Sequence, residues 1–269
     1  MIPKKIHYCW FGGNPLPEWA TQYINSWTKF CPDYDIIQWD ETNYDVNKID
    51  YMKQAYQLKK WGFVPDYARL DIIYNHGGVY LDVDVEIIKP FDDLLKENGF
   101  AGFESEKFVA LGLGFGAEKG NPVIKEMMEQ YERMSFINDD GTLNLLASPS
   151  YSSDILKKMG YELNGKYQKG ENFTIYPTDF FCPQDYETGV MRITDNTYSI
   201  HHYAATWHTF WDKAVISIER CENKSGIEHK IRRCISFPLR VANKINKIGI
   251  KRTVGFIVEK YIKRTKARR

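Results

Sequence analysis

The chain has 269 residues, of which 43% are hydrophobic and 15% aromatic, so it can bury a sizeable core and is not an intrinsically disordered protein. The net charge of +1 is unevenly distributed, because residues 219–269 carry 16 Lys and Arg against 4 Asp and Glu. The first 218 residues carry 20 basic against 31 acidic residues. We therefore predict an acidic domain over residues 1–213 and a basic helical extension over 214–269. The acidic body argues against nucleic acid as a partner.

Targeting and redox signals point to the cytoplasm. The five cysteines form no C-x-x-C pair, so neither a disulfide framework nor a zinc site is indicated. The N-terminus lacks the apolar region of a signal peptide, and no run of about 18 apolar residues predicts a transmembrane helix. We expect a protein that is cytoplasmic or peripheral on the cytoplasmic face of the inner membrane.

The N-terminal elements predict a parallel α/β sheet. A buried strand over Ile6–Phe11 ends at a Gly-rich turn, a helix follows over Pro17–Phe30, and Tyr34–Trp39 reads as the second strand. Strand, helix and strand at this spacing predict a right-handed crossover. The sequence contains neither G-x-G-x-x-G nor G-x-x-x-x-G-K-[ST], so a dinucleotide fingerprint and a P-loop are not supported.

The next helix is predicted from Pro65, which suits a first turn, to Gly77, which suits a C-terminus. Asp66 and Arg69 are three residues apart and hence neighbours on one face. By themselves they could form an exposed ion pair worth a few tenths of a kcal/mol. Because the helix leads through two glycines directly into an acidic strand, we expect the pair to lie close to that strand's carboxylates.

The acidic strand is predicted over Val79–Glu86. Alternation places its valines and Leu81 on one face, and Tyr80, Asp82, Asp84 and Glu86 on the other. Adjacent carboxylates repel each other unless a cation lies between them. A divalent metal that carries a phosphate satisfies this requirement, and the alternative is a solvated acidic face.

Further strands are predicted over Phe100–Phe103 and Leu111–Phe115, an amphipathic helix over Asn121–Met134, and a helix with Ser153 or Asp154 as its N-cap. Thr174–Pro177 and Phe180–Pro183 favour edge strand and loop.

Two adjacent histidines, His201 and His202, stand at a strand end before Ala204-Ala205-Thr206-Trp207. Histidines in such a place are either structural or metal ligands, and both interpretations stay open here. In the tail, Val241, Ile245 and Ile248 form an apolar stripe among basic residues. Such helices either lie on an anionic membrane surface, at about 1 kcal/mol per basic residue, or pack on the body as a helical subdomain.

In their order and spacing, four motifs of this chain resemble those of glycosyltransferases with a D-x-D sugar-binding motif. These are Ile6–Gly13, Asp66-x-x-Arg69, Gly77–Asp84 and His201-His202 with Thr206-Trp207. The resemblance is to the family 32 enzymes of capsular and lipopolysaccharide synthesis, which are related to yeast mannosyltransferases and more distantly to clostridial glucosylating toxins. It covers most of residues 1–212 and implies a GT-A fold, which is an α/β fold with a Rossmann-like open sheet flanked by helices.

The resemblance also implies roles for particular residues. Trp10 would stack on the nucleotide base, and Asp66 and Arg69 would hold the donor sugar. Asp82 would contact the ribose or sugar and the metal shell, and Asp84 would ligate Mn²⁺ or Mg²⁺ directly. His201 or His202 would complete the metal–diphosphate site. Gly78, Tyr80, Thr206 and Trp207 complete the set of predicted site residues.

The activity implied is transfer of a hexose from a nucleotide sugar, with retention at the anomeric carbon, to a glycan or lipid-linked acceptor in surface polysaccharide synthesis. A UDP-sugar is the first expected donor and GDP-mannose the second. Front-face attack is favoured over a covalent intermediate, because no further acidic residue stands out as a nucleophile. Catalysis would then come from positioning and electrostatic stabilisation.

Three other classes are weighed against a transferase. A phosphohydrolase would carry its D-x-D on the first strand, with Thr or Val where Glu86 stands. A metal-independent glycoside hydrolase needs two carboxyl groups about 5–10 Å apart and no nucleotide. A non-catalytic module that binds sugar nucleotides would show no turnover.

Overall fold

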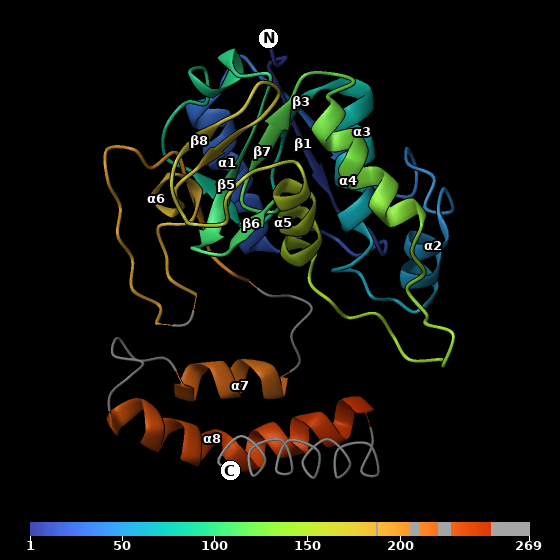
Figure 1. Ribbon diagram of the computed structural model, residues 1–269, viewed down its shortest axis with the longest axis vertical. Helices are drawn as coiled ribbons and strands as arrows, with labels where there is room; N and C mark the ends of the chain where they lie inside the picture. The colour runs from blue at the N-terminus through green and yellow to red at the C-terminus, as the bar shows by residue number, and fades with distance from the viewer. Residues whose placement is uncertain (187, 205–209, 220–226, 249–269) are drawn as a thin grey trace. The chain divides into compact units, whose positions relative to one another are not determined.

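The computed structural model describes residues 1–186, 188–204, 210–219 and 227–248 (Figure 1). Contacts divide the chain into two compact units, one formed by residues 1–184 and 191–204 and the other by 185–190 and 205–269. The predicted domain division at residue 213 stays a prediction. Thr206, Trp207 and the last part of the basic tail lie outside the described residues.

The strands of the first unit are β1 (Lys5–Cys9), β2 (Asp35–Trp39), β3 (Gly78–Tyr80), β4 (Val85–Ile87), β5 (Gly99–Ser105), β6 (Phe108–Ala110), β7 (Phe115–Ala117), β8 (Gln168–Lys169), β9 (Thr174–Tyr176) and β10 (Ser199–His201). Its helices are α1 (Glu18–Phe30), α2 (Asp50–Gln57), α3 (Pro65–His76), the 3₁₀ turn η1 (Leu94–Lys96), α4 (Pro122–Glu132), α5 (Ser148–Lys158) and α6 (Thr178–Phe181).

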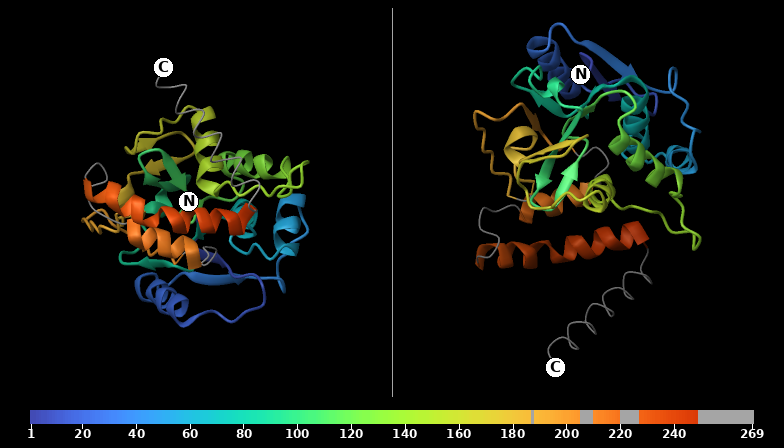
Figure 2. Two further views of the ribbon diagram at one scale, coloured as in Figure 1. Left: turned by 90° about the horizontal axis from the view of Figure 1, so that it is seen from below. Right: turned by 45° about the horizontal axis from the view of Figure 1, so that its top comes forward.

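The main sheet has the strand order β2-β1-β3-β7-β5-β9-β8, and β6 pairs with β5. The neighbours β2, β1 and β3 are parallel, whereas β7 is antiparallel to β3. β4 and β10 form a separate antiparallel ladder. One hydrophobic cluster includes side chains of α2, α3, α4 and α5, and a second includes side chains of α1 and α6. The helices thus flank the sheet on both faces (Figures 1 and 2), and the predicted α/β fold with an open, Rossmann-like sheet is confirmed.

Helix α1 ties the sheet to the short β4 strand. The indole of Trp27 is fully buried, and its Nε1–H donates to the backbone oxygen of Val85 at 2.7 Å. The preceding Ser26 accepts a hydrogen bond from the backbone N–H of Ile87 at 2.9 Å. Two successive residues of one helix therefore hold both ends of β4.

Helix α3 runs through the core instead of lying on its surface. Pro65 occupies its first turn and Gly77 caps its C-terminus with a φ of 64°, as predicted. Residues 66–73 are all buried, including Asp66, Arg69 and Asp71. The alternative of an exposed Asp66–Arg69 ion pair is therefore excluded.

The predicted continuous strand over Val79–Glu86 is wrong. β3 ends at Tyr80 and β4 begins at Val85, and between them the backbone turns so that the N–H of Val85 donates to the oxygen of Asp82. The break occurs because β3 pairs within the main sheet, whereas β4 pairs with β10 in the other ladder. Residues 81–84 alternate in polarity without being a strand.

Four other segments differ from expectation. Residues 111–113 form a turn between β6 and β7, and Phe180 and Phe181 belong to the short helix α6. α5 begins at Ser148 after Ala147, upstream of the predicted caps Ser153 and Asp154. β9 lies between β5 and β8, so it is not an edge strand.

The second unit contains α7 (Phe210–Glu219) and α8 (Ile227–Ile248), which pack against each other. Asn243 donates to Asp212 at 2.6 Å, and Arg240 pairs with Glu219 at 3.2 Å. The tail is therefore helical in its described part. Among the described side chains of α8, the exposed large hydrophobic residues are Ile227, Ile231, Ile235 and Phe237. Among the described residues, none of the helices combines the length and the apolar character that a membrane span requires.

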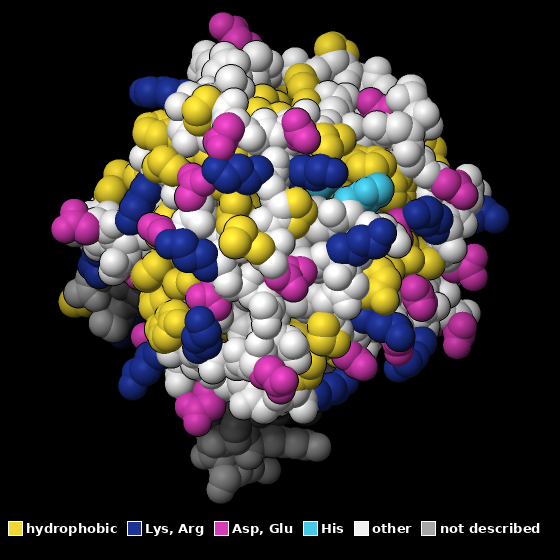
Figure 3. Space-filling view, turned by 90° about the horizontal axis from the view of Figure 1, so that it is seen from above, with side chains coloured by type: hydrophobic (Ala, Val, Ile, Leu, Met, Phe, Trp, Pro, Cys, Tyr) yellow, Lys and Arg dark blue, Asp and Glu magenta, His cyan; other side chains and the backbone are white. Residues whose placement is uncertain are grey.

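The face in Figure 3 carries basic and acidic side chains interspersed with apolar ones. It presents mixed charge instead of one patch of a single sign. The excess of basic over acidic residues lies in the tail sequence.

We expect Trp27→Phe to lower the free energy of unfolding by about 2–4 kcal/mol, because it leaves the buried Val85 oxygen without its donor and opens a small cavity. The measurement is urea denaturation followed by circular dichroism. Trp19→Phe, a change in a half-buried residue of the same helix, serves as the control and should cost less than about 1 kcal/mol. Equal destabilisation by the two substitutions would contradict the anchoring role of Trp27.

Candidate functional site

The site lies at the carboxyl ends of β1 and β3. β1 pairs with β2 on one side and with β3 on the other, so the order of the chain reverses between β1 and β3. In open α/β sheets, ligands bind in the crevice at such a switch point. Trp10 follows directly on β1, and Asp82 comes two residues after β3. Trp10 and Asp82, both predicted from the sequence, therefore lie at the carboxyl edge of the sheet.

Asp82 is held by contacts on several sides. Its backbone N–H donates to the oxygen of Gly112 at 3.1 Å, and its carboxylate accepts a hydrogen bond from the Tyr80 hydroxyl. The guanidinium of Arg69 lies 3.7 Å from its Oδ2. Tyr80 itself is buried, with its ring 5.3 Å from the Arg69 guanidinium. Tyr80 therefore orients Asp82 from within the core.

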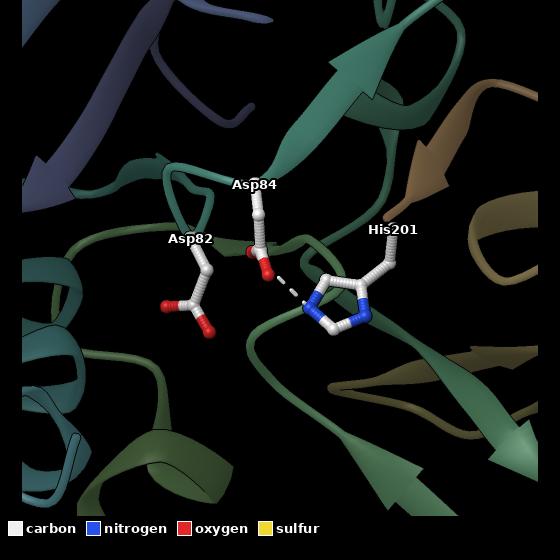
Figure 4. Close-up of side chains that lie close together, drawn as sticks. All are labelled: Asp82, Asp84 and His201. Atoms are coloured by element: carbon white, nitrogen blue, oxygen red, sulfur yellow. Dashed lines mark ion pairs between the residues drawn. The ribbon is translucent and has the colours of Figure 1, made fainter. Parts of the chain in front are cut away.

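Asp84 is the more enclosed of the two aspartates. Its Oδ1 lies 3.2 Å from Nε2 of His201, and its Oδ2 accepts the backbone N–H of Ala204 at 2.9 Å. The β4–β10 ladder fixes this contact, because His201 stands opposite Val85 in its register. Figure 4 shows Asp82 and Asp84 projecting from the turn and His201 reaching toward them from β10.

The electrostatics of the three groups follow from burial and mutual charge. Burial raises the pKa of Asp82. Burial opposes the charged form of Asp84 as well, but the His201 imidazole and the backbone hydrogen bond from Ala204 together outweigh it and lower the pKa of that carboxyl. Burial likewise disfavours protonated His201, yet Asp84 raises the pKa of the imidazole. The cluster therefore concentrates negative charge and compensates part of it with His201.

The donor set fits a divalent cation. Asp82, Asp84 and His201 each offer one ligand atom, and these atoms all lie within 4.8 Å of one another. Two carboxylate oxygens suit Mg²⁺ or Mn²⁺, and the imidazole nitrogen is better tolerated by Mn²⁺. These three residues are therefore the ones that would hold a metal.

Asp66 and Arg69 form a buried ion pair beside the cluster. Nη2 of Arg69 lies 2.6 Å from Oδ1 of Asp66, and its Nε donates to the backbone oxygen of Pro65 at 3.1 Å. Burial raises the pKa of Asp66 to about 6 against the opposing effect of Arg69. The Ser148 hydroxyl donates to the same carboxylate. Such a pair fixes the position of its groups more than it stabilises the fold.

A narrow cavity opens beside this pair. It is lined by Asp66 and Arg69 from α3 together with Leu70, Leu111, Met127, Gln130, Tyr131, Ser148, Tyr151, Ser152 and Ile155. The hydroxyl-bearing and amide side chains of α4 and α5 give it several hydrogen-bonding groups. Sequence reasoning missed this contribution, since residues of α4 and α5 reach α3 only through tertiary packing.

Some predicted residues lie apart from the cluster. Nε2 of His202 pairs with Oε2 of Glu86 at 2.8 Å, and its ring stacks on Tyr23 with centroids 4.4 Å apart. His201, not His202, is thus the histidine that faces Asp84. Gly78 stands at the start of β3, where an added Cβ would lie 2.9 Å from both His7 and Lys5. Its role in the structure is close packing of β3 on β1.

Trp10 remains at the site edge, half-buried, with its indole N–H donating to the backbone oxygen of Asn14 at 2.7 Å. Gly112 is a close neighbour of the predicted site residues that the sequence analysis missed. A Cβ there would lie 2.2 Å from Oδ2 of Asp82 and 3.2 Å from Nη1 of Arg69. The only local signal was the glycine itself within an apolar run.

We expect Gly112→Ala to displace the Asp82 carboxylate and to weaken Mn²⁺ binding by roughly 10- to 100-fold, as does loss of a group that orients a metal ligand. Isothermal titration calorimetry with MnCl₂ measures this, and circular dichroism checks that the fold is retained. Gln22→Ala, a change in an exposed residue of α1 that leaves the charge unaltered, is the control and should bind Mn²⁺ as the unmodified protein does. Unchanged Mn²⁺ affinity in Gly112→Ala would contradict this placement of Asp82.

Comparison with known families gives a match over residues 17–101, to the family described as "Glycosyltransferase sugar-binding region containing DXD motif". The matched segment runs from the turn before α1 into β5 and contains Asp66, Arg69, Asp82 and Asp84. The family resemblance predicted from the motifs is confirmed.

Among curated proteins, the chain is similar to two from Schizosaccharomyces pombe. It is 27% identical to inositol phosphoceramide mannosyltransferase 3 over 143 residues, which are 50% of this chain and 38% of that protein. It is 27% identical to inositol phosphoceramide mannosyltransferase 1 over 165 residues, which are 56% of this chain and 50% of that protein. The chain thus spans at most half the length of these relatives.

Two solved structures are also similar. One is the PaToxG glycosyltransferase, with a TM-score of 0.45, 16% identity, and coverage of 59% of this chain and 70% of that one. The other is a glycosyltransferase involved in glycosylation of the major capsid of PBCV-1, with a TM-score of 0.43, 10% identity, and coverage of 75% and 95%. Scores this low do not bear on substrate or mechanism.

Proposed function

We propose, from the family of DXD-containing glycosyltransferase sugar-binding regions to which residues 17–101 belong, that this protein transfers a hexose from a nucleotide sugar. The observation that carries the proposal is the convergence of Asp82, Asp84 and His201 beside the buried Asp66–Arg69 pair. A carboxylate-rich metal site next to a fixed ion pair suits a sugar diphosphate. The diphosphate would reach the metal, and the sugar would reach the pair.

Mn²⁺ or Mg²⁺ would be held by Asp84, Asp82 and His201. When bound, the ion supplies charge neutralisation for the departing nucleoside diphosphate. The chain's own residues position the groups around it. Tyr80 and the Gly112 backbone hold Asp82, and the backbone N–H of Ala204 holds Asp84.

The Asp66–Arg69 pair is suited to bind sugar hydroxyls. Both side chains are buried and mutually bonded, so the remaining carboxylate and guanidinium positions are fixed in space. Trp10, at the end of β1, would stack on the base of the nucleotide. Hydrogen-bonding groups in fixed positions lower the entropic cost of orienting the nucleotide sugar. Much of the rate enhancement would arise from this positioning.

The stereochemical course proposed is retention by front-face attack. Glu86, the third acid of the D-x-D segment, is bonded to His202, so it is not placed to act as a nucleophile. The acceptor hydroxyl would lose its proton to the leaving phosphate, and the enzyme would contribute positioning and electrostatic stabilisation.

Two donors merit direct comparison. Resemblance to UDP-sugar-using toxins favours a UDP-hexose. The names of the two Schizosaccharomyces pombe relatives favour mannose, for which GDP-mannose is the donor predicted second. The same names describe transfer to inositol phosphoceramide, a lipid, which supports a lipid-linked or glycan acceptor for this chain. A role in capsular or lipopolysaccharide synthesis at the cytoplasmic face of a membrane would fit such an acceptor.

The central test is a thermal-shift panel of UDP- and GDP-sugars with and without Mn²⁺. We expect a rise in Tm of several degrees only when metal and the correct nucleotide sugar are both present, because ligand binding stabilises the folded state by mass action. Asp84→Ala should remove this rise. Glu86→Gln, which retains a partner for His202, is the matched control and should keep it.

EDTA separates this proposal from its alternatives. A shift that persists in EDTA, or full metal-dependent stabilisation of Asp84→Ala, would contradict the metal assignment. A metal-independent glycoside hydrolase would keep its activity in EDTA. A non-catalytic binding module would show the shift but release no nucleotide from the cognate sugar donor.

The basic tail is proposed to bind anionic membrane surface. We expect the double change Lys230→Glu with Arg233→Glu to weaken sedimentation with phosphatidylserine vesicles at least about tenfold, since each basic residue near such a surface contributes about 1 kcal/mol. Both side chains are exposed on α8. Lys53→Glu with Lys107→Glu makes the same charge change on the first unit and should leave sedimentation unaltered. Equal sedimentation of the α8 variant and the unmodified protein would refute the membrane role.

A further inference from the structure

A second cavity is formed by the later turns of α3 and by residues 39–48, at the end of β2 and in the loop after it. Its volume is about 350 Å³, whereas the cavity beside Asp66 and Arg69 measures about 10 Å³. Pockets that bind small ligands commonly measure about 300–1,000 Å³, and the smaller cavity has room for about one water. The larger cavity is lined by Trp39, Asn43, Tyr44, Asp45, Lys48, Asp71, Ile72, Asn75 and His76. This lining is separate from the cluster of Asp82, Asp84 and His201.

Trp39 forms an aromatic wall of this cavity and is held by a buried histidine. Its Nε1–H donates to Nδ1 of His7 at 3.1 Å, and Nε2 of His7 lies 3.0 Å from the backbone oxygen of Gly77. Because His7 is fully buried, its pKa falls to about 4 and its ring is neutral at pH 7. A neutral imidazole that accepts at Nδ1 donates at Nε2, so one arrangement of protons satisfies both bonds. The indole is therefore fixed in orientation.

A buried carboxylate, Asp71, organises the polar part of the lining. Its Oδ2 accepts hydrogen bonds from the Tyr44 hydroxyl at 2.7 Å and from Nζ of Lys48. Its Oδ1 accepts a hydrogen bond from Nδ2 of Asn75 at 2.8 Å. Asp71 is only 6% exposed, whereas Lys48 and Asn75 are exposed. The cavity therefore presents polar groups in fixed positions beside an aromatic surface, which is the composition of a small-molecule site.

The charges of the lining favour an uncharged ligand. Two carboxylates, Asp45 and Asp71, line the cavity together with one ammonium group, that of Lys48, which is paired with Asp71. Burial and neighbouring lysines lower the pKa of His76, so its imidazole is mainly neutral at pH 7. A phosphate would meet net negative charge here, and a metal ion would have to displace the donors that already bind Asp71. A polyhydroxylated molecule with an apolar face suits both the polar groups and the indole of Trp39.

We propose that this cavity binds a small neutral saccharide, with one face of a pyranose ring against Trp39. The sugar hydroxyls would hydrogen-bond to Asp71, Asn75 and His76. The inference goes beyond the proposed transfer reaction, because it requires neither the metal nor the nucleotide sugar. The backbone N–H of Trp10, at the candidate donor site, donates to the backbone oxygen of Trp39 at 2.9 Å. The saccharide site thus adjoins the donor site and would hold a sugar unit of a glycan acceptor.

The test is saturation-transfer difference NMR on the full chain with the methyl glycosides of mannose, glucose and galactose, in EDTA and without nucleotide. We expect transfer to at least one glycoside, strongest at the ring C–H protons that would lie on the indole. Trp39→Ala should weaken its binding about tenfold or more, because the aromatic contact is lost.

A second variant keeps the test decisive if Trp39→Ala does not fold. The double change Asn75→Ala with His76→Ala alters two exposed residues and should weaken binding roughly tenfold by removing two hydrogen-bonding groups. Gln57→Ala, in an exposed residue of α2, is the control and should bind the glycoside as the unmodified protein does.

A further readout locates the ligand. In ¹H–¹⁵N spectra, the indole signal of Trp39 is identified by its absence in Trp39→Phe, and that of Trp10 by its absence in Trp10→Phe. Addition of the glycoside should shift the Trp39 signal more than the Trp10 signal. A larger shift of the Trp10 signal would assign the sugar to the donor site and overturn the proposal. UMP serves as the anionic probe, and a shift of the Trp39 signal with UMP but not with a glycoside would likewise overturn it.

Failure of this site is distinguishable from failure of the proposed transferase. If no glycoside shows saturation transfer, or if transfer is unchanged in the cavity variants, the saccharide site is overturned, whereas metal-dependent binding of nucleotide sugars is unaffected. Glycoside binding that persists in Asp84→Ala supports a site independent of the metal cluster. Loss of glycoside binding in Asp84→Ala would place the sugar at that cluster and overturn the proposal.

Discussion

The structure depends on accommodating two carboxylates, Asp82 and Asp84, in a largely buried turn. Burial disfavours ionised carboxyl groups, and two neighbouring ones repel each other, so compensation must come from outside the turn. Arg69 supplies it from one side, 3.7 Å from Asp82, and His201 supplies it from the other, 3.2 Å from Asp84. Much of the architecture near the site brings those two side chains to the turn. Helix α3 carries the guanidinium through the core, and the β4–β10 ladder carries the imidazole.

The same requirement explains why polar residues lie where apolar ones would stabilise the fold better. A buried ion pair such as Asp66–Arg69 returns little net stability, because desolvation offsets its attraction. Here the pair sits on a helix buried along most of its length and borders a narrow, mainly apolar cavity. Buried charged residues that cost folding stability are expected where the position of their groups matters more than the stability of the fold. Gly112 meets the same requirement, because its backbone lies so close to Asp82 that a single added methyl group would collide with the carboxylate.

The motifs were predictable from sequence because each is local. Asp66-x-x-Arg69 lies within one helical turn, and Asp82-x-Asp84 within one turn of backbone, so their neighbours along the chain identify them. The continuous strand was wrong because the alternation of residues 79–86 spans two strands that pair in different sheets, and alternation carries no information about partners. Gly112 and the walls of the cavity could not be predicted at all. Their importance arises only when the β6–β7 turn packs against Asp82 and when α4 and α5 pack beside α3, and nothing in their own segments records those contacts.

Charge balance also indicates how metal and donor would depend on each other. Three aspartates, Asp66, Asp82 and Asp84, face two cationic side chains, Arg69 and His201, and those cations are already engaged with the carboxylates. A nucleoside diphosphate adds further negative charge, which these residues have no free cation to neutralise. A divalent ion would supply it, held by Asp82, Asp84 and His201 as three protein ligands, with positions left for phosphate oxygens. The nucleoside diphosphate would complete the coordination of the metal, and the metal would complete the charge balance of the diphosphate. We therefore expect the two to bind cooperatively in this site.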